Sequence, residues 1–144
     1  MTQPAKINGI IAADEARHAS AYSAFVQRIF ELDPSQMMTA FEDMMRRKIV
    51  MPAHFMRQTG DKAGELWEHF SDAAQRTKVY TAQDYIDILS GLIKEWDIEH
   101  ITDLNAAGEK ARDYLMALPD RLQRVTNRMK DPEKEYEFKW IGTH

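Results

Sequence analysis

Two side chains with metal-binding chemistry, Glu15 and His18, lie three positions apart in the run Ile11-Ala-Ala-Asp-Glu-Ala-Arg-His18. Both fall on the apolar stripe of a predicted helix, because apolar residues flank them in steps of three and four. An ionised carboxylate on a buried stripe needs a charged partner or a metal, since its desolvation is otherwise very costly. We therefore expect the helix to bury both side chains toward a bundle centre, on the face that Ile11 and Tyr22 share.

Two interpretations of this pair stay open from the residues alone. Glu-x-x-His is the spacing with which di-iron carboxylate bundles offer both groups to one metal centre. In the alternative, Glu15 meets an arginine and His18 makes a hydrogen bond in the core. The chain has no cysteine, so any metal must be held by His, Glu and Asp, which suit iron or manganese as well as zinc.

The composition indicates an ordinary soluble domain. The chain has 144 residues, of which 44% are hydrophobic and 29% charged, so we expect one domain over 1–144. The net charge of -4 argues against nucleic-acid binding, because no Lys/Arg stripe is present to neutralise phosphates. The longest apolar runs are too short to span a membrane, and the first residues lack the apolar core of a signal peptide.

The elements that position the pair are predicted to be almost all helical. A first helix covers about 4–31, and Asp33-Pro34 starts a second, because Asp caps helices well and Pro favours the first helical position. This second helix carries a stripe of methionines, which favours core packing; a pocket for a flexible chain is the alternative. Pro52 is expected to bend or end it, and residues 57–64 form a turn-rich loop.

The second half of the chain shows similar signals. A short amphipathic helix is predicted around 66–74, and Thr81 to Asp84 has the form of a capping box that opens the next helix. A last helix is expected to start near 102–103 and to be broken by Pro119. Alternating aromatic and charged residues over 136–140 predict a short extended or strand-like tail.

Short motifs along nearly the whole chain support a family assignment. They are Ile11 to His18, Phe30-Glu-Leu-Asp-Pro34, Asp43-Met-Met-Arg46, Met51-Pro-Ala-His54, His69-Phe70, Ala74-Gln-Arg76, Val79-Tyr-Thr-Ala82, Asp84-Tyr85 and Asp113-Tyr114. In this order they resemble the C-terminal half of the soluble acyl-carrier-protein fatty acid desaturases. The resemblance implies an all-α, ferritin-like di-iron bundle, here about five helices and the tail. The first half of that family, with a lone Glu ligand, a first Glu-x-x-His and a second lone Glu, has no counterpart in these residues.

The resemblance also implies an activity and its parts. Relatives use two irons and oxygen to introduce a cis double bond into a saturated acyl chain on acyl carrier protein, with electrons from a ferredoxin. It makes Glu15 and His18 iron ligands and places Asp14 beside them, hydrogen-bonded to a ligand histidine. From the residues alone, Asp14 is an exposed carboxylate or pairs with His18. The protein is expected in the cytoplasm of a bacterium or the plastid of a plant.

Other residues receive roles only through the same resemblance. The acyl tunnel is implied to be lined by Tyr22, Met51, Pro52, Trp67 and Tyr80. Arg17 faces outward and is implied to contact the acidic carrier protein, together with the basic run 46–48. Charge runs are usually solvated faces, and that alternative stays open.

Three functional hypotheses follow for a chain with one Glu-x-x-His. It is a desaturase half that acts with a complementing N-terminal half or as a homo-oligomer, a truncated non-catalytic relative that binds acyl chains or carrier protein, or another ferritin-like metal-binding oxidase. The first is favoured. Alone, the chain is expected to expose apolar surface, to self-associate and to bind iron weakly, without activity.

Overall fold

The computed structural model describes residues 2–47 and 65–130. These contain five α-helices, a 3-10 helix and no strand, which confirms the all-α class over the described ranges. Pro52, the loop predicted at 57–64 and the extended tail predicted at 136–140 lie outside those ranges. The elements are α1 (Gln3–Leu32), α2 (Pro34–Arg46), α3 (Glu65–Thr77), α4 (Ala82–Glu95), η2 (Ile98–His100) and α5 (Ala106–Thr126).

Two predicted helix starts are confirmed at their caps. The Asp33 carboxylate accepts a hydrogen bond of 3.1 Å from the backbone N–H of Gln36, and Pro34 occupies the first position of α2. At α4, the Thr81 hydroxyl accepts from the N–H of Asp84 at 3.3 Å, and the Asp84 carboxylate accepts from the N–H of Thr81 at 2.7 Å. Each cap satisfies backbone groups that have no partner within the helix.

The predicted start of the last helix is wrong by a few residues. Asn105 is the N-cap of α5, and its side-chain oxygen accepts a 2.9 Å hydrogen bond from the N–H of Gly108. Before it, the chain turns through η2 and two residues in the left-handed conformation, Asp97 and Asp103. Asp tolerates this conformation better than most non-glycine residues, and the turn delays α5.

Pro119 does not end α5, which continues to Thr126. A proline inside a helix costs about 3 kcal/mol, because it removes a hydrogen bond and crowds the preceding turn. Burial offsets this cost, since Leu115 is fully buried and Leu118 nearly so. Fully burying each leucine contributes about 1.5–3 kcal/mol.

The core forms where α2, α4 and α5 meet, together with η2 and the C-terminal end of α1. Gly108 allows α5 to approach α2 closely, because a Cβ there would lie 3.3 Å from the Cα of Ser35. Ile98 of η2 is fully buried, so the connection between α4 and α5 also belongs to the core. The core residues are Phe30, Met38, Phe41, Leu89, Ile93, Ile98, Ala111, Leu115 and Leu118.

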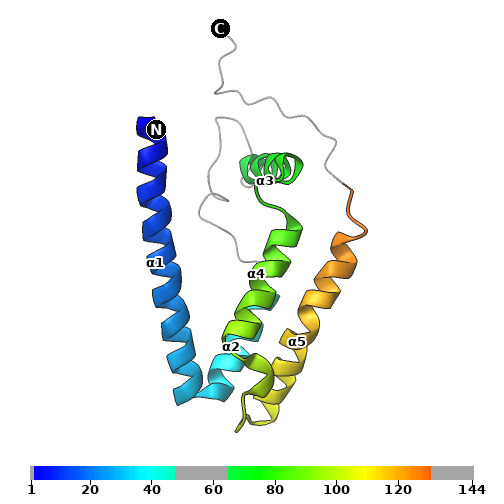
Figure 1. The fold of residues 1–144 in the computed structure, drawn as a ribbon. Helices are drawn as coiled ribbons and strands as arrows, with labels where there is room; N and C mark the ends of the chain where they lie inside the picture. Colours follow the sequence, from blue (N-terminus) through cyan, green and yellow to red (C-terminus); the bar gives the residue numbers. More distant parts are fainter. Residues whose placement is uncertain (1, 48–64, 131–144) are drawn as a thin grey trace.

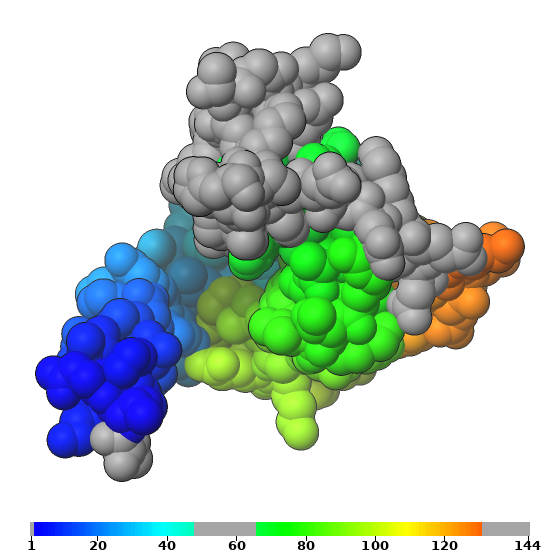
Figure 2. All heavy atoms as spheres, turned by 90° about the horizontal axis from the view of Figure 1, so that it is seen from above, coloured from blue at the N-terminus to red at the C-terminus, as the bar shows by residue number. Residues whose placement is uncertain are grey.

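The helix α1 stands apart from this core over most of its length. Figure 1 shows α1 and α5 diverging from the base of the molecule, with α3 lying across the upper end of α4. Seen from above, the N-terminal end of α1 lies to one side of the rest (Figure 2). Phe30 is the buried residue of α1, and every residue over 2–22 is exposed.

The prediction that α1 buries Glu15 and His18 is therefore wrong within the described residues. Their side chains are 72% and 61% exposed, and Ile11 and Tyr22 are exposed as well, at 51% and 66%. The spacing identified an apolar face correctly, but an apolar face is buried only where another element packs on it. Over 2–22 the described parts of the chain supply no such element.

Candidate metal centre

Glu15 and His18 lie next to each other on one face of α1. The helix places residues three apart on the same side, and Glu15 Oε2 is 3.8 Å from His18 Nδ1. The His18 ring also lies beside Tyr22, with 6.5 Å between ring centroids. The predicted adjacency of the two candidate ligands is thus present in the structure, although the predicted burial is not.

The donor set of this pair fits an iron ion. Two atoms that bind one metal at about 2.1 Å each lie at most about 4.2 Å apart, and the observed separation of 3.8 Å lies within that span. One carboxylate oxygen and one imidazole nitrogen are ligands that iron accepts. Over residues 2–47 and 65–130, no group of three or more His, Cys, Asp or Glu residues could hold a metal. Among the described residues the pair therefore offers two candidate ligands, with no third such group beside it.

Asp14 and Arg17 form an ion pair with each other on α1. One interpretation of Asp14 was that it pairs with His18. In the structure it pairs with Arg17 instead. The alternative interpretation of Glu15 and His18 is not seen among the described residues either. There Glu15 lies against His18 and no arginine pairs with it, and His18 is too exposed for a core hydrogen bond. The Arg17 side chain remains 70% exposed, so it still faces solvent as predicted.

The predicted tunnel residues are divided among several elements. Tyr22 lies on α1 and contacts Phe25, with 6.5 Å between ring centroids. Trp67 lies on α3, stacked on Phe70 at 6.1 Å, and Tyr80 lies exposed in the turn before α4. Two further predicted tunnel residues, Met51 and Pro52, lie outside the described residues.

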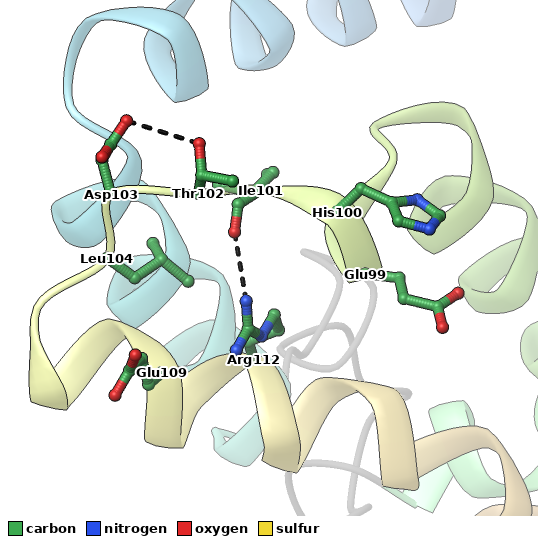
Figure 3. A pocket seen from close by; sticks show the side chains of 8 residues that line it. All are labelled: Glu99, His100, Ile101, Thr102, Asp103, Leu104, Glu109 and Arg112. Carbon is green, nitrogen blue, oxygen red and sulfur yellow. Dashed lines mark hydrogen bonds between the residues drawn. The ribbon is translucent and has the colours of Figure 1, made fainter.

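The connection between α4 and α5 forms a surface hollow that the sequence analysis missed. It has a volume of about 470 Å³ and is lined by residues of 99–104 with Glu109 and Arg112 of α5 (Figure 3). The Arg112 guanidinium donates a 3.1 Å hydrogen bond to the carbonyl of Ile101 and so ties the connection to α5. The sequence gave no signal for this hollow, because a polar loop followed by a helix N-cap is a common pattern that does not indicate a pocket.

One lining residue, His100, has a shifted pKa. Its Nδ1 lies 2.6 Å from the Asp97 carboxylate, and this hydrogen bond, with the charge of Asp97, raises the pKa of His100 above its ordinary value of 6.5. Both side chains are exposed at about 70%. The pair lies in the connection between α4 and α5 rather than on α1, and among the described residues it does not join Glu15 and His18 in a group that could hold a metal.

No helix among the described residues is long and apolar enough to cross a membrane.

A family profile described as "Fatty acid desaturase" matches residues 2–142. Among curated relatives, the chloroplastic stearoyl-acyl-carrier-protein 9-desaturase 1 of Arabidopsis thaliana is 47% identical over 140 residues, which cover 94% of this chain and 35% of the relative. The chloroplastic stearoyl-acyl-carrier-protein 9-desaturase of Ricinus communis is 48% identical over 140 residues, 95% of this chain and 35% of the relative. The chain thus spans about a third of the length of these relatives.

Proposed function

Because this chain belongs to the acyl-carrier-protein desaturase family, we propose that it forms part of an enzyme that introduces a cis double bond into a saturated acyl chain on acyl carrier protein. The observation that carries the proposal is the 47% identity over 140 residues to a stearoyl-acyl-carrier-protein 9-desaturase. The adjacent carboxylate and imidazole on α1 support it, because they are the groups that such a site requires. In this proposal residues 1–144 are one domain of a ferritin-like bundle.

Glu15 and His18 are proposed to hold one iron of a di-iron centre. When bound, the irons supply the oxygen-activating chemistry, with electrons from a ferredoxin-type donor. The Glu15 carboxylate and the His18 imidazole bind and fix the metal, while the Asp14 carboxylate accepts a hydrogen bond from another ligand histidine and orients it. This last role requires Asp14 to leave the ion pair with Arg17 that the structure shows.

The rest of the ligand set is proposed to come from outside these 144 residues. A complete site of this family uses four Glu and two His ligands, and this sequence contains one Glu-x-x-His. The exposed face of α1 supports the proposal, because its large apolar side chains are positioned to pack on the helices that bring the remaining ligands. These side chains are Ile7, Ile10, Ile11, Tyr22, Phe25, Ile29 and Leu32.

The substrate side of the proposal rests on the family resemblance. Tyr22, Met51, Pro52, Trp67 and Tyr80 are proposed to line the acyl tunnel. The side chain of Arg17 is exposed, and we propose that it contacts acyl carrier protein. This carrier appears in the names of the relatives. Those relatives are chloroplastic, and we propose a plastid location for a plant source and the cytoplasm for a bacterial one.

The test combines this chain with a separately expressed polypeptide that carries the missing ligands. With ferrous iron, ferredoxin and a reductase, gas chromatography of the released acyl chains should show desaturation of stearoyl carrier protein. Glu15→Ala and His18→Ala should each abolish it. Glu31→Ala is the matched control, because Glu31 lies on the same helix and its carboxylate pairs with Arg28. Turnover that survives Glu15→Ala and His18→Ala would show that other residues hold the iron.

A further inference from the structure

A chain of polar contacts joins α1 to the C-terminal end of α4. The indole N–H of Trp96, the C-cap residue of α4, donates a 2.9 Å hydrogen bond to the hydroxyl of Ser23 on α1. The same hydroxyl donates to the Glu95 carboxylate. The contact spans more than seventy positions of sequence, so it fixes two helices relative to each other rather than stabilising one of them.

The direction of this hydrogen-bond chain is set by its members. An indole N–H can only donate and an ionised carboxylate can only accept, so the serine hydroxyl must do both. The bond to Glu95 is charge-assisted and therefore stronger than one between neutral groups. A side chain without a hydroxyl at position 23 would remove both of these hydrogen bonds.

Trp96 also packs at the junction of three helices. Its ring lies 6.2 Å from that of Phe30 on α1 and 5.4 Å from that of Phe41 on α2, the second in an edge-on arrangement. Both phenylalanines are buried core residues. Trp96 thus connects the core, through Ser23, to the part of α1 that leaves the core.

Ser23 occupies a particular place along α1. It is the most N-terminal residue of α1 that is not exposed in the described structure. Glu15 lies eight residues nearer the N-terminus of α1, which is about 12 Å from Ser23 at 1.5 Å per residue. The direction of α1 at Ser23 therefore decides where the candidate ligands lie.

We propose that Ser23, Glu95 and Trp96 form a clamp that sets the angle of α1 and thereby positions Glu15 and His18. The ligand role of that pair rests on the proposed function, but the clamp itself does not. Without the clamp, the next residue of α1 that packs against the core is Val26, which is half-buried. It lies about 16 Å from Glu15, so a tilt of about 10° there would move Glu15 by about 3 Å. The distances between ligand atoms and a metal must hold within about 0.2 Å. A loosely held α1 would therefore not keep Glu15 and His18 at the right distance from a metal shared with other ligands.

The test measures the angle of α1 directly and needs no metal. Since the chain has no cysteine, Gly9→Cys on α1 and Asp120→Cys on α5 provide two unique sites for spin labels, and both positions are exposed. The distance distribution between the labels is measured by pulsed electron spin resonance in the full chain. Ser23→Ala removes the hydroxyl, Trp96→Phe keeps the aromatic packing without the N–H, and Ser23→Thr restores a hydroxyl. Ser20→Ala is the control, because among the described residues the Ser20 hydroxyl bonds the carbonyl of Ala16 within α1 and reaches no other helix.

We expect a narrow distribution in the parent chain, in Ser20→Ala and in Ser23→Thr. Ser23→Ala and Trp96→Phe should broaden it about twofold, because the bond that fixes the helix angle is lost, while helix content by circular dichroism stays unchanged. An unchanged distribution in Ser23→Ala and Trp96→Phe would overturn the clamp. Broadening in those two variants would support the clamp. If Glu15 and His18 then bind no iron even with a polypeptide that supplies the remaining ligands, the proposed function is rejected while the clamp stands.

Discussion

The base of the molecule and the N-terminal two-thirds of α1 differ in what surrounds their apolar side chains. At the base, α2, α4, α5 and η2 bury Met38, Ile98 and Leu115 completely. Along α1 from Gln3 to Tyr22 every residue is exposed, including the two candidate metal ligands. The comparison shows that folding stability and candidate chemistry lie in different parts of this chain, and that only the first is complete within the described residues.

The largest expected effect separates the two regions by stability. Leu115→Ala should lower the free energy of unfolding by about 2–5 kcal/mol, because it leaves a cavity in a fully buried site. At a chain concentration low enough to prevent self-association, Ile11→Ala on the exposed face of α1 should change it by about 0.5 kcal/mol or less. Urea denaturation followed by circular dichroism measures both. A loss from Ile11→Ala as large as that from Leu115→Ala would mean that α1 is packed in solution.

The second effect concerns what the exposed face of α1 does in solution. Ile7→Gln combined with Phe25→Gln should weaken self-association of the chain by about tenfold or more, because burying each large apolar side chain contributes about 1.5–3 kcal/mol. Val79→Gln is the control, since Val79 is also exposed but lies outside α1. Sedimentation velocity measures the change. A compact monomer with a cooperative melt in the parent chain would contradict the prediction that this face needs a partner.

A smaller effect is expected at the capping box of α4. Thr81→Ala should destabilise the fold by about 1 kcal/mol, the usual contribution of an N-cap. The Thr81 hydroxyl and N–H both donate to Asp84 and lower the pKa of its carboxyl below the ordinary 3.8. The stabilisation is therefore present above about pH 3.8 and is lost as the pH falls through the lower folded value. Denaturation curves from pH 7 to pH 2 should show this loss in the parent chain and less of it in Thr81→Ala.

The smallest effect lies in the hollow between α4 and α5. Asp97→Asn should lower the pKa of His100 toward 6.5, because the hydrogen bond and charge of Asp97 raise it. In the parent chain the His100 interaction contributes below the unfolded pKa and is lost as the pH rises through the raised folded pKa. NMR titration of the His100 ring follows the shift. An identical titration midpoint in Asp97→Asn would show that the pair does not form in solution.

The parts of the fold that could be predicted from the sequence are those with local causes. Asp33 with Pro34, and Thr81 with Asp84, start their helices through contacts within four residues, so the cap signals were sufficient. The continuation of α5 through Pro119 was not predictable, because it depends on the burial of Leu115 and Leu118 against other helices.

The candidate site shows the same division between local and distant causes. The adjacency of Glu15 and His18 follows from helical spacing alone and is present. Their burial was predicted from the apolar stripe, but burial requires a second surface, which a periodic pattern cannot supply. The contact between Ser23 and Trp96 joins positions 73 residues apart, and neither residue carries a local signal for it.

The most direct test of the account is the iron stoichiometry of the chain, measured by anaerobic titration with ferrous iron. Alone, the chain should bind well below two irons. With a polypeptide that supplies the remaining Glu and His ligands, it should bind two, and Glu15→Ala or His18→Ala should remove that gain while Glu31→Ala leaves it. Two irons bound by the isolated chain, or full occupancy in Glu15→Ala and His18→Ala, would contradict the assignment of Glu15 and His18 as ligands that need a partner.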